Sequence, residues 1–284
     1  MSYQPYMGRI INGKPLPGTN LSISCWDKGI LYGYGLFETM RVHRKTILAL
    51  EEHLQRLASS CHRLNIVDNL FWLDLKSIVQ EYVITTNLEE GALRLSITKG
   101  DPSKGVEPLF FLTSRDLSYS PQDYEKGFRA VVSPHKKNET SLLVYHKTLN
   151  NLENIMVLEE SRRKGANEAL FLNTNHLLTE GTMSNLFFVY GRTIFTPSIS
   201  CGLLNGITRQ TVIRLASDMG YRVIEGEYAL DNLLTATEAF LTNSLMEIMP
   251  LVKIENQYID RGKPGRVTRE LLHYYQKLTR NNCL

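Results

Sequence analysis

Apolar residues recur along this 284-residue chain with two different spacings, and their alternation limits the fold more than any other feature of the sequence. In ALRLSIT (92–98) they occupy every second position, as in a strand with one polar face. Over residues 49–64 they recur at intervals of three and four, as in an amphipathic helix. Segments of both kinds follow one another in both halves of the chain, which predicts a mixed α/β (α+β) protein.

The polar run SYSPQDYEKG (118–127) separates the two halves. It contains Pro121 and Gly127 and few apolar residues, and a fresh strand-like segment begins directly after it. We therefore predict an N-terminal α/β domain over 1–117, a linker over 118–127 and a C-terminal α/β domain over 128–284. A ligand site in the crevice between two such domains is the expected arrangement.

The periodicities also predict the individual elements. In the N-terminal half they predict strands near 8–12, 37–42, 92–98 and 108–114, a turn at 13–15, and helices over 49–64 and from 70 to about 87. In the C-terminal half they predict strands at 128–133, 168–172, 184–190, 193–196 and 238–242, and helices over 152–164, 208–219 and 265–279.

Composition excludes several classes of protein. Lys and Arg number 32 and Asp and Glu 29, a net charge of +3 with both signs interleaved, so no basic stripe for nucleic acid is expected. The four cysteines lie far apart without a CxxC pair, and the seven histidines form no ligand pair, so neither a disulfide framework nor a metal site is expected. Cysteines without a disulfide framework favour a reducing cytoplasm, and no segment has the length and apolar character to span a bilayer.

Lys147 is the first candidate for chemistry. It lies in VYHKTLNNLENIM, between an apolar stretch and a predicted helix. A lysine amine held against apolar walls has a lowered pKa and can act as a nucleophile or form a Schiff base. An ordinary solvated lysine would fit the same pattern, so this residue alone leaves both interpretations open.

Two further segments could hold an anion or a heterocycle. Glu180 in LLTEGTMSNLFFV is either a turn residue or a buried carboxylate that holds a proton on a ring nitrogen. In LLNGITRQT (203–211), Gly206 precedes a helix whose first amides, at Ile207 and Thr208, would point at a phosphate. Thr208 as an ordinary N-cap is the alternative.

Small polar and basic residues give weaker indications. The predicted strand in FLTNSLMEIMP (240–250) ends in Thr242, Asn243 and Ser244, which suit either a phosphate or a turn. Arg56, in HLQRL, lies off the leucine stripe of its predicted helix and suits either a solvated flank or a phosphate contact.

Six phrases follow one another along the chain in the order LYGYGLFETMRV, HLQRL, HKTLNNL, TEGTMSNLFFV, LLNGITRQ and LTNSLMEIMP, and the resemblance that they carry covers nearly the whole chain. Together they resemble the fold-type IV pyridoxal-phosphate enzymes, the class IV aminotransferase family. The resemblance implies a homodimer of two-domain α/β subunits, with pyridoxal 5'-phosphate bound between the domains and a small-molecule substrate.

The resemblance also implies a role for each matching residue. Lys147 would form the Schiff base with the cofactor, and Glu180 would pair with its pyridine nitrogen. Leu204 would lie against the face of the cofactor ring, and Phe37 would lie beside the substrate. The phosphate would be bound by Arg56, Ile207, Thr208 and Ser244. Arg94, on the polar face of its strand, is our candidate for binding a substrate carboxylate, with Lys99 as second choice.

Within the family, the phrases GLFETMRV, GLLNGITRQ and LTNSLMEIMP most resemble the aminodeoxychorismate lyases. Branched-chain aminotransferases have a glycine pair after the lysine and a tyrosine five residues on, whereas this chain has Thr148, Leu149 and Leu152. D-amino-acid aminotransferases carry an arginine and a histidine in the loop that here reads ITKGDPSKG (97–105), which has no histidine. The resemblance therefore implies a lyase that converts 4-amino-4-deoxychorismate to 4-aminobenzoate and pyruvate.

Two alternatives stay open. One fold hosts several chemistries, so transamination of a branched-chain or D-amino acid is the first. The second is a non-catalytic family member that acts as an interaction protein, against which the presence of Lys147 and Glu180 argues.

Overall fold

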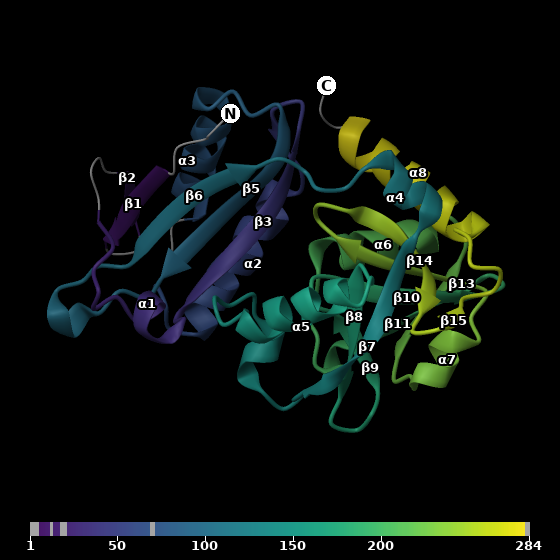
Figure 1. Cartoon of the computed structure of the whole chain (residues 1–284). Coiled ribbons are helices and arrows are strands. Elements are labelled where there is room, and N and C mark those ends of the chain that lie inside the picture. Colours follow the sequence, from purple (N-terminus) through teal and green to yellow (C-terminus); the bar gives the residue numbers. More distant parts are fainter. Residues whose placement is uncertain (1–5, 12–13, 18–21, 69–71, 282–284) are drawn as a thin grey trace. The chain divides into compact units, whose positions relative to one another are not determined.

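The computed structural model describes residues 6–11, 14–17, 22–68 and 72–281 of the chain (Figure 1). These residues divide into two compact units. The first holds the chain up to Leu117 together with the short segment His146–Asn151, and the second holds Ser118–Tyr145 and Leu152–Asn281. The mixture of helices with two sheets confirms the predicted fold class.

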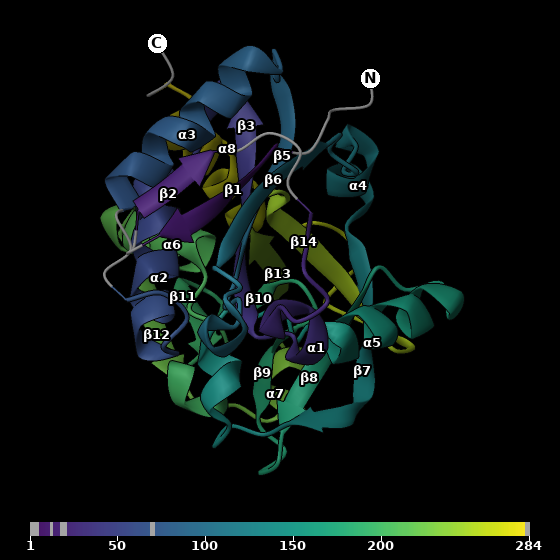
Figure 2. The ribbon, with the colours of Figure 1, turned by 90° about the vertical axis from the view of Figure 1, so that its left-hand side faces the viewer.

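The first unit is built on a six-stranded sheet in the order β2-β1-β6-β5-β3-β4, in which every pair is antiparallel. Its elements are β1 (Tyr6–Ile11), β2 (Lys14–Pro17), α1 (Lys28–Tyr32), β3 (Gly35–His43), β4 (Thr46–Ile47), α2 (Leu50–Arg63), α3 (Trp72–Thr85), β5 (Glu90–Thr98), η1 (Pro102–Lys104) and β6 (Leu109–Arg115). Helices α2 and α3 cover one face of this sheet (Figure 2).

Alternation along β3 decides which side chains meet those helices. Leu36, Met40 and Val42 belong to the buried core that α2 and α3 complete. Because successive side chains of a strand point to opposite faces, Phe37 and Thr39 belong to the other face. Register pairs Phe37 with Ser96 and Thr39 with Arg94, so the polar face predicted for β5 lies on this side of the sheet.

The second unit is built on a nine-stranded mixed sheet that closes on itself. The strands follow the order β12-β11-β10-β13-β14-β7-β8-β9, β15 pairs with β14, and β9 also pairs with β10. Six strands therefore form a ring. The strands are β7 (Phe128–Lys137), β8 (Glu168–Asn173), β9 (Leu178–Gly181), β10 (Asn185–Tyr190), β11 (Thr193–Pro197), β12 (Arg222–Gly226), β13 (Glu238–Asn243), β14 (Glu247–Ile254) and β15 (Gln257–Tyr258).

The described residues of the second unit also form helices, several of which pack against strands of this sheet. They are α4 (Pro121–Lys126), η2 (Leu142–Tyr145), α5 (Leu152–Arg163), η3 (Ile199–Cys201), α6 (Ile207–Asp218), α7 (Leu230–Leu234) and α8 (Arg266–Asn281). Leu186 and Phe188 of β10 belong to one buried cluster, whereas Phe187 and Val189 belong to another that α6 and α8 complete. Both faces of β10 are thus buried, which explains its unbroken apolar run.

Several predictions differ from the structure in informative ways. The segment 118–127 contains helix α4 and belongs to the second unit, although its polar composition indicated a linker. Strands β9 and β12 and helix α7 were not predicted, because such short elements carry too few residues for a periodicity. Strand β14 was not predicted because nearly all of its residues are buried, which leaves no alternation of apolar and polar residues. Part of the predicted turn at 13–15, the last residue of the strand predicted at 8–12 and the start of the helix predicted from 70 lie outside the described residues.

None of the described helices combines the length and the apolar character needed to cross a membrane.

Candidate active site

Lys147 lies in a segment that pairs with the start of β3. Leu36 and Thr148 form an antiparallel bridge, the N–H of Phe37 donates to the oxygen of Lys147 at 2.9 Å, and the N–H of Leu149 donates to the oxygen of Gly35 at 2.9 Å. These backbone bonds are why residues 146–151 belong to the first unit, and not to the C-terminal domain in which the sequence placed Lys147.

Gly35 allows this pairing. A Cβ atom at that position would collide with the backbone oxygen of Ile97 and lie 2.6 Å from Cδ1 of Leu149. The glycines of LYGYG therefore bring the Lys147 segment close to the sheet, where a side chain would push it away.

The ring of Phe37 lies close to two cationic groups. Nζ of Lys147 is 4.5 Å from the ring centroid, and the guanidinium carbon of Arg94 is 3.7 Å from it. Nε of Arg94 also donates to Oγ of Ser96 at 3.2 Å. Burial, and then the charge of Arg115, lower the pKa of Arg94. The structure thus gathers three sequence candidates, Lys147, Phe37 and Arg94, within the first unit.

Behind β3 lies a buried ionic cluster formed by Glu38, His53 and Arg56. Arg56 donates to both carboxylate oxygens of Glu38, at 2.8 and 2.6 Å, and Nδ1 of His53 lies 2.6 Å from Oε2. Burial alone would raise the pKa of Glu38, but the charges and hydrogen bonds of Arg56 and His53 outweigh it and lower the pKa to about 2. Arg56 is therefore an oriented, partly buried cation and not a solvated flank.

Lys99 and His146 have contacts of their own. Nζ of Lys99 donates to the backbone oxygen of Asn65 and lies 5.9 Å from the ring centroid of Tyr34, so its contacts differ from those of Arg94. Nδ1 of His146 lies 3.0 Å from Oγ of Ser60, and burial lowers its pKa.

In the second unit, Glu180 is buried at the end of β9. Its Oε2 accepts from the N–H of Leu204 at 3.1 Å and from Nδ2 of Asn185 at 3.3 Å. The same Asn185 amide donates to the oxygen of Leu204 at 2.8 Å, and its register partner on β9 is Glu180. A buried carboxylate at a fixed position is what a protonated ring nitrogen requires, so the turn-residue interpretation of Glu180 does not describe its surroundings.

The loop from Leu204 leads into α6, whose N-terminus has no side-chain cap. The first helical bond runs from the N–H of Gln210 to the oxygen of Gly206, so the amides of Ile207 and Thr208 lie ahead of it. The Thr208 side chain is buried, and it is Gly206 and not Thr208 that occupies the N-cap. Free amides and the positive end of the helix dipole suit an anion.

Thr242 and Ser244 lie at the end of β13. Thr242 pairs in register with Asn185, and its Oγ1 is buried with no hydrogen-bond partner among the described residues. Asn243 accepts from the amides of Leu245 and Met246 at 2.9 and 2.8 Å, which turns the chain after Ser244. The second unit therefore places β9, β10 and β13 side by side where Glu180, Asn185 and Thr242 lie.

The sequence did not single out Glu38, His53 or Asn185. A signal was present for one of them, because His53 lies three residues before Arg56 and so shares its helix face. Glu38 and Asn185 gave no such signal, since their partners lie on other elements. Within the described ranges, no group of three or more His, Cys, Asp and Glu side chains is placed to hold a metal ion.

The model of the family described as amino-transferase class IV matches residues 35–254 of this chain. These residues include every candidate named above, from Phe37 to Ser244.

Three proteins of similar sequence are named for three different activities. The chain is 31% identical to a Methanocaldococcus jannaschii protein provisionally named as a branched-chain-amino-acid aminotransferase, covering 94% of this chain and 95% of that protein. It is 30% identical to an aminodeoxychorismate lyase of Bacillus subtilis, with 95% and 94% covered. It is 28% identical to a D-alanine aminotransferase of Bacillus licheniformis, with 92% and 93% covered.

A solved structure is also similar. The T.th. branched-chain amino acid aminotransferase with pyridoxamine 5'-phosphate is 25% identical and superposes with a TM-score of 0.86 over 96% of this chain and 94% of that one.

Proposed function

Because this chain belongs to the class IV aminotransferase family, we propose that it is a lyase that converts 4-amino-4-deoxychorismate to 4-aminobenzoate and pyruvate. The enzymes of this family depend on pyridoxal 5'-phosphate. The proposal concerns the reaction, the substrate and the roles of individual residues.

The residues of the second unit fit this cofactor. An uncapped helix N-terminus at α6 suits its phosphate, and the buried carboxylate of Glu180 suits its pyridine nitrogen. The Oγ1 atom of Thr242, buried without a partner among the described residues, has hydrogen-bonding capacity that a ligand could use. A buried hydroxyl without a partner among the described residues is costly in a protein that binds nothing there.

Individual roles follow from these positions. Glu180 would hold the proton on the pyridine nitrogen, and Leu204 would lie against the ring. The phosphate would be bound by four groups: the amides of Ile207 and Thr208, the hydroxyl of Ser244 and the guanidinium of Arg56. Lys147 would hold the cofactor covalently between turnovers.

When bound, the cofactor supplies an electron sink for the negative charge left when a proton is removed next to the substrate amine. The amine of Lys147 would take the proton from the ring carbon that carries the substrate amine. The C–O bond to the enolpyruvyl group then breaks with its electron pair, the ring becomes aromatic as 4-aminobenzoate, and protonation of the departing enol gives pyruvate.

One observation supports the choice of substrate. The Phe37 ring, with the Arg94 guanidinium at 3.7 Å and the Lys147 amine at 4.5 Å, offers an aromatic surface and positive charge in one place. A cyclohexadiene ring that becomes aromatic and carries two carboxylates on its substituents matches both properties. Lys99 remains the second candidate for a carboxylate, although its amine binds the oxygen of Asn65.

Transamination of a branched-chain or D-amino acid is the second candidate function. Its support is the names of two relatives, a branched-chain-amino-acid aminotransferase and a D-alanine aminotransferase. The same cofactor contacts serve both reactions, so the distinction depends on the substrate side of the site.

We also propose that the chain forms a homodimer in the cytoplasm. Four large apolar side chains on or beside α1 are exposed and would be covered in a dimer: Trp26, Ile30, Leu31 and Tyr32, with exposed fractions of 56%, 58%, 46% and 68%. Light scattering of the purified protein measures the mass directly, and a monomer at micromolar concentration would contradict this.

The proposed reaction is tested by supplying 4-amino-4-deoxychorismate to the purified holoenzyme and following pyruvate through a coupled lactate dehydrogenase assay. Keto-acid exchange with 2-oxoglutarate is measured in parallel for branched-chain L-amino acids and for D-alanine. We expect rapid pyruvate release and slow exchange. Rapid exchange without pyruvate would replace the lyase by the aminotransferase, and inactivity in both assays, with cofactor bound, would favour the non-catalytic alternative.

A further inference from the structure

A second buried carboxylate, Glu168, lies at the start of β8 and has no part in the mechanism above. Only 4% of its surface is exposed, although a buried charge is expensive unless it is well satisfied. Burial raises the pKa of Glu168, and hydrogen bonds from Thr182 and Ser184 oppose that rise.

Among the described residues, the hydrogen-bonding partners of Glu168 beyond its own strand come from one turn. Oε1 accepts from the N–H of Thr182 at 3.0 Å and from the Thr182 hydroxyl, and Oε2 accepts from the N–H of Met183 at 3.3 Å and from Oγ of Ser184 at 2.8 Å. The N–H of Ala169 donates to Oε1 as well, at 3.0 Å. Three of these partners, the N–H groups of Ala169, Thr182 and Met183, can only donate, so the arrangement fits a side chain that presents two acceptor oxygens.

The carbonyl groups of the same turn are also bound. Nδ2 of Asn154 donates to the oxygen of Thr182 at 2.7 Å, and Nδ2 of Asn243 donates to the oxygen of Met183 at 3.0 Å. The N–H of Gly181 closes the turn on the oxygen of Ser184 at 2.7 Å. Residues 181–184 are therefore fixed from three different elements.

This turn joins Glu180 to Asn185. The two residues are register partners, and the pairing of β9 with β10 consists of that one pair. They converge on Leu204, because Glu180 accepts from its N–H and Asn185 donates to its oxygen. A shift of the turn would change the position of Glu180 relative to both partners.

Gly181 shows how closely Glu168 approaches the turn. A Cβ atom at Gly181 would lie 2.9 Å from Cδ of Glu168 and would collide with Oγ of Ser184. Only glycine allows the carboxylate to reach the donors of the turn, so the glycine of TEGTMSN and the acid of NEALF, far apart in the sequence, form one local structure.

We propose that Glu168 is a positioning residue, which holds the 181–184 turn so that Glu180 and Asn185 present a fixed carboxylate to the pyridine nitrogen of the cofactor. The inference rests on the proposed role of Glu180 and is independent of which reaction follows.

The test is the variant Glu168→Gln, which keeps the size of the side chain and replaces one acceptor oxygen by an NH2 group facing donors. Apo-protein is titrated with pyridoxal 5'-phosphate, and the dissociation constant and the absorption spectrum of the bound cofactor are recorded. Disruption of this buried hydrogen-bond network should weaken cofactor binding about tenfold and change the pH dependence of the spectrum.

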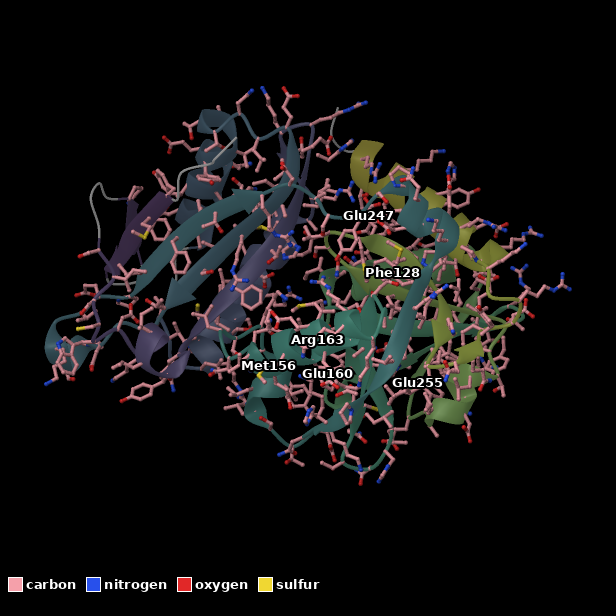
Figure 3. The ribbon with its side chains drawn as sticks, viewed as in Figure 1. Phe128, Met156, Glu160, Arg163, Glu247 and Glu255 are labelled. Carbon is pink, nitrogen blue, oxygen red and sulfur yellow. The ribbon has the colours of Figure 1, made fainter. Side chains whose placement is uncertain are left out.

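The matched control is Glu247→Gln. Glu247 is also buried, in the same unit, and accepts from Gln276 at 2.7 Å and from Arg280 at 2.8 and 2.9 Å beside helix α8 (Figure 3). This variant should lower the melting temperature but leave the dissociation constant within about twofold of the original value. If both variants weaken cofactor binding equally, Glu168 contributes only to stability and the proposal is wrong.

Two further variants keep the result interpretable. Ser184→Ala removes a single donor to Glu168 and should weaken cofactor binding less than Glu168→Gln does, so it provides the test if the glutamine variant does not fold. Glu180→Gln is the reference. If Glu180→Gln changes the spectrum and neither Glu168→Gln nor Ser184→Ala does, the positioning role of Glu168 is wrong and the role of Glu180 stands. If the spectrum of Glu180→Gln is unchanged, the proposed role of Glu180 is itself wrong.

Discussion

The backbone N–H of Phe37 donates to the backbone oxygen of Lys147 at 2.9 Å. The candidate nucleophile is thus attached to β3 through main-chain hydrogen bonds, which a change of its side chain does not remove. Replacing the amine should leave the segment in place, so a substitution of Lys147 can remove activity without unfolding the protein.

Lys147→Ala is the first prediction. We expect turnover to fall by about 10²–10⁴-fold or more, since no other amine is held by this segment to move the proton. The melting temperature should stay close to that of the original protein. Borohydride treatment followed by mass spectrometry should find the cofactor attached to the original protein and not to the variant.

The control for this variant is Lys164→Ala. Lys164 is exposed and pairs with Glu160 one helical turn away, so its loss should change neither turnover nor the borohydride adduct. Near-normal turnover in Lys147→Ala would contradict the assignment of the nucleophile.

Gly35→Ala is the second prediction. The new methyl group would collide with the oxygen of Ile97 and with Leu149, so the chain around Lys147 must move. We expect a loss of about 1–3 kcal/mol in the free energy of unfolding, together with reduced turnover. Denaturant unfolding and steady-state kinetics measure the two effects.

Gly165→Ala is the control for Gly35→Ala, because it introduces backbone strain without a steric collision. Gly165 has a φ of +76°, and apart from Gly165 and its two chain neighbours no atom of the described residues lies within 4 Å of a Cβ placed there. This control should cost about 1 kcal/mol of strain and leave turnover unchanged. Equal losses of turnover in both glycine variants would refute the close-approach argument.

The third prediction concerns pH. The pKa of Glu38 is lowered from 4.5 to about 2, so its ionised form stabilises the fold above pH 4.5, and that contribution disappears as the pH falls toward 2. The shift corresponds to about 3 kcal/mol. Glu38→Gln should therefore flatten the acid limb of the plot of unfolding free energy against pH.

Glu160→Gln is the comparison for that plot. The Glu160 carboxylate pairs with Lys164 at the surface, where salt and water screen the interaction, so its neutralisation should change the acid limb little. An acid limb unchanged in Glu38→Gln would show that the Glu38–Arg56–His53 cluster does not govern acid stability.

The fourth prediction is Arg94→Met. Arginine is expected to bind a substrate carboxylate through charged hydrogen bonds, so its loss should raise KM about 10–100-fold while cofactor affinity stays unchanged. KM is measured by steady-state kinetics. The substrate is the one that the parallel assays of pyruvate release and keto-acid exchange identify. The exposed Arg129, on β7, provides the control variant Arg129→Met, which should behave as the original protein. An unchanged KM in Arg94→Met would transfer the role to Lys99.

Much of the fold could be predicted from the sequence. The leucine spacing over 49–64 corresponds to α2 (Leu50–Arg63), and the alternation in ALRLSIT corresponds to β5. Periodicity predicts such elements well because each one buries a face along its own length. It gave no sign that β9 would pair with both β8 and β10 and close the sheet.

The candidate site, like the fold, could be predicted in part from the sequence. The order of phrases along the chain was enough to indicate the family, and to single out Lys147, Glu180 and the start of α6. The residue types at those positions are what pyridine, phosphate and Schiff-base chemistry require, and residue type is written in the sequence.

Only the tertiary structure decided which residues that are far apart in the sequence contact one another. Lys147 joined the first unit because residues 146–151 bond to β3, and Glu38 met Arg56 because a helix crosses behind its strand. Glu168 reached the turn after Glu180 because β8 and β9 are neighbours in the ring. Local sequence determines periodicity and chemistry, whereas these contacts arise from packing between segments far apart in the chain, whose pairing no local pattern records.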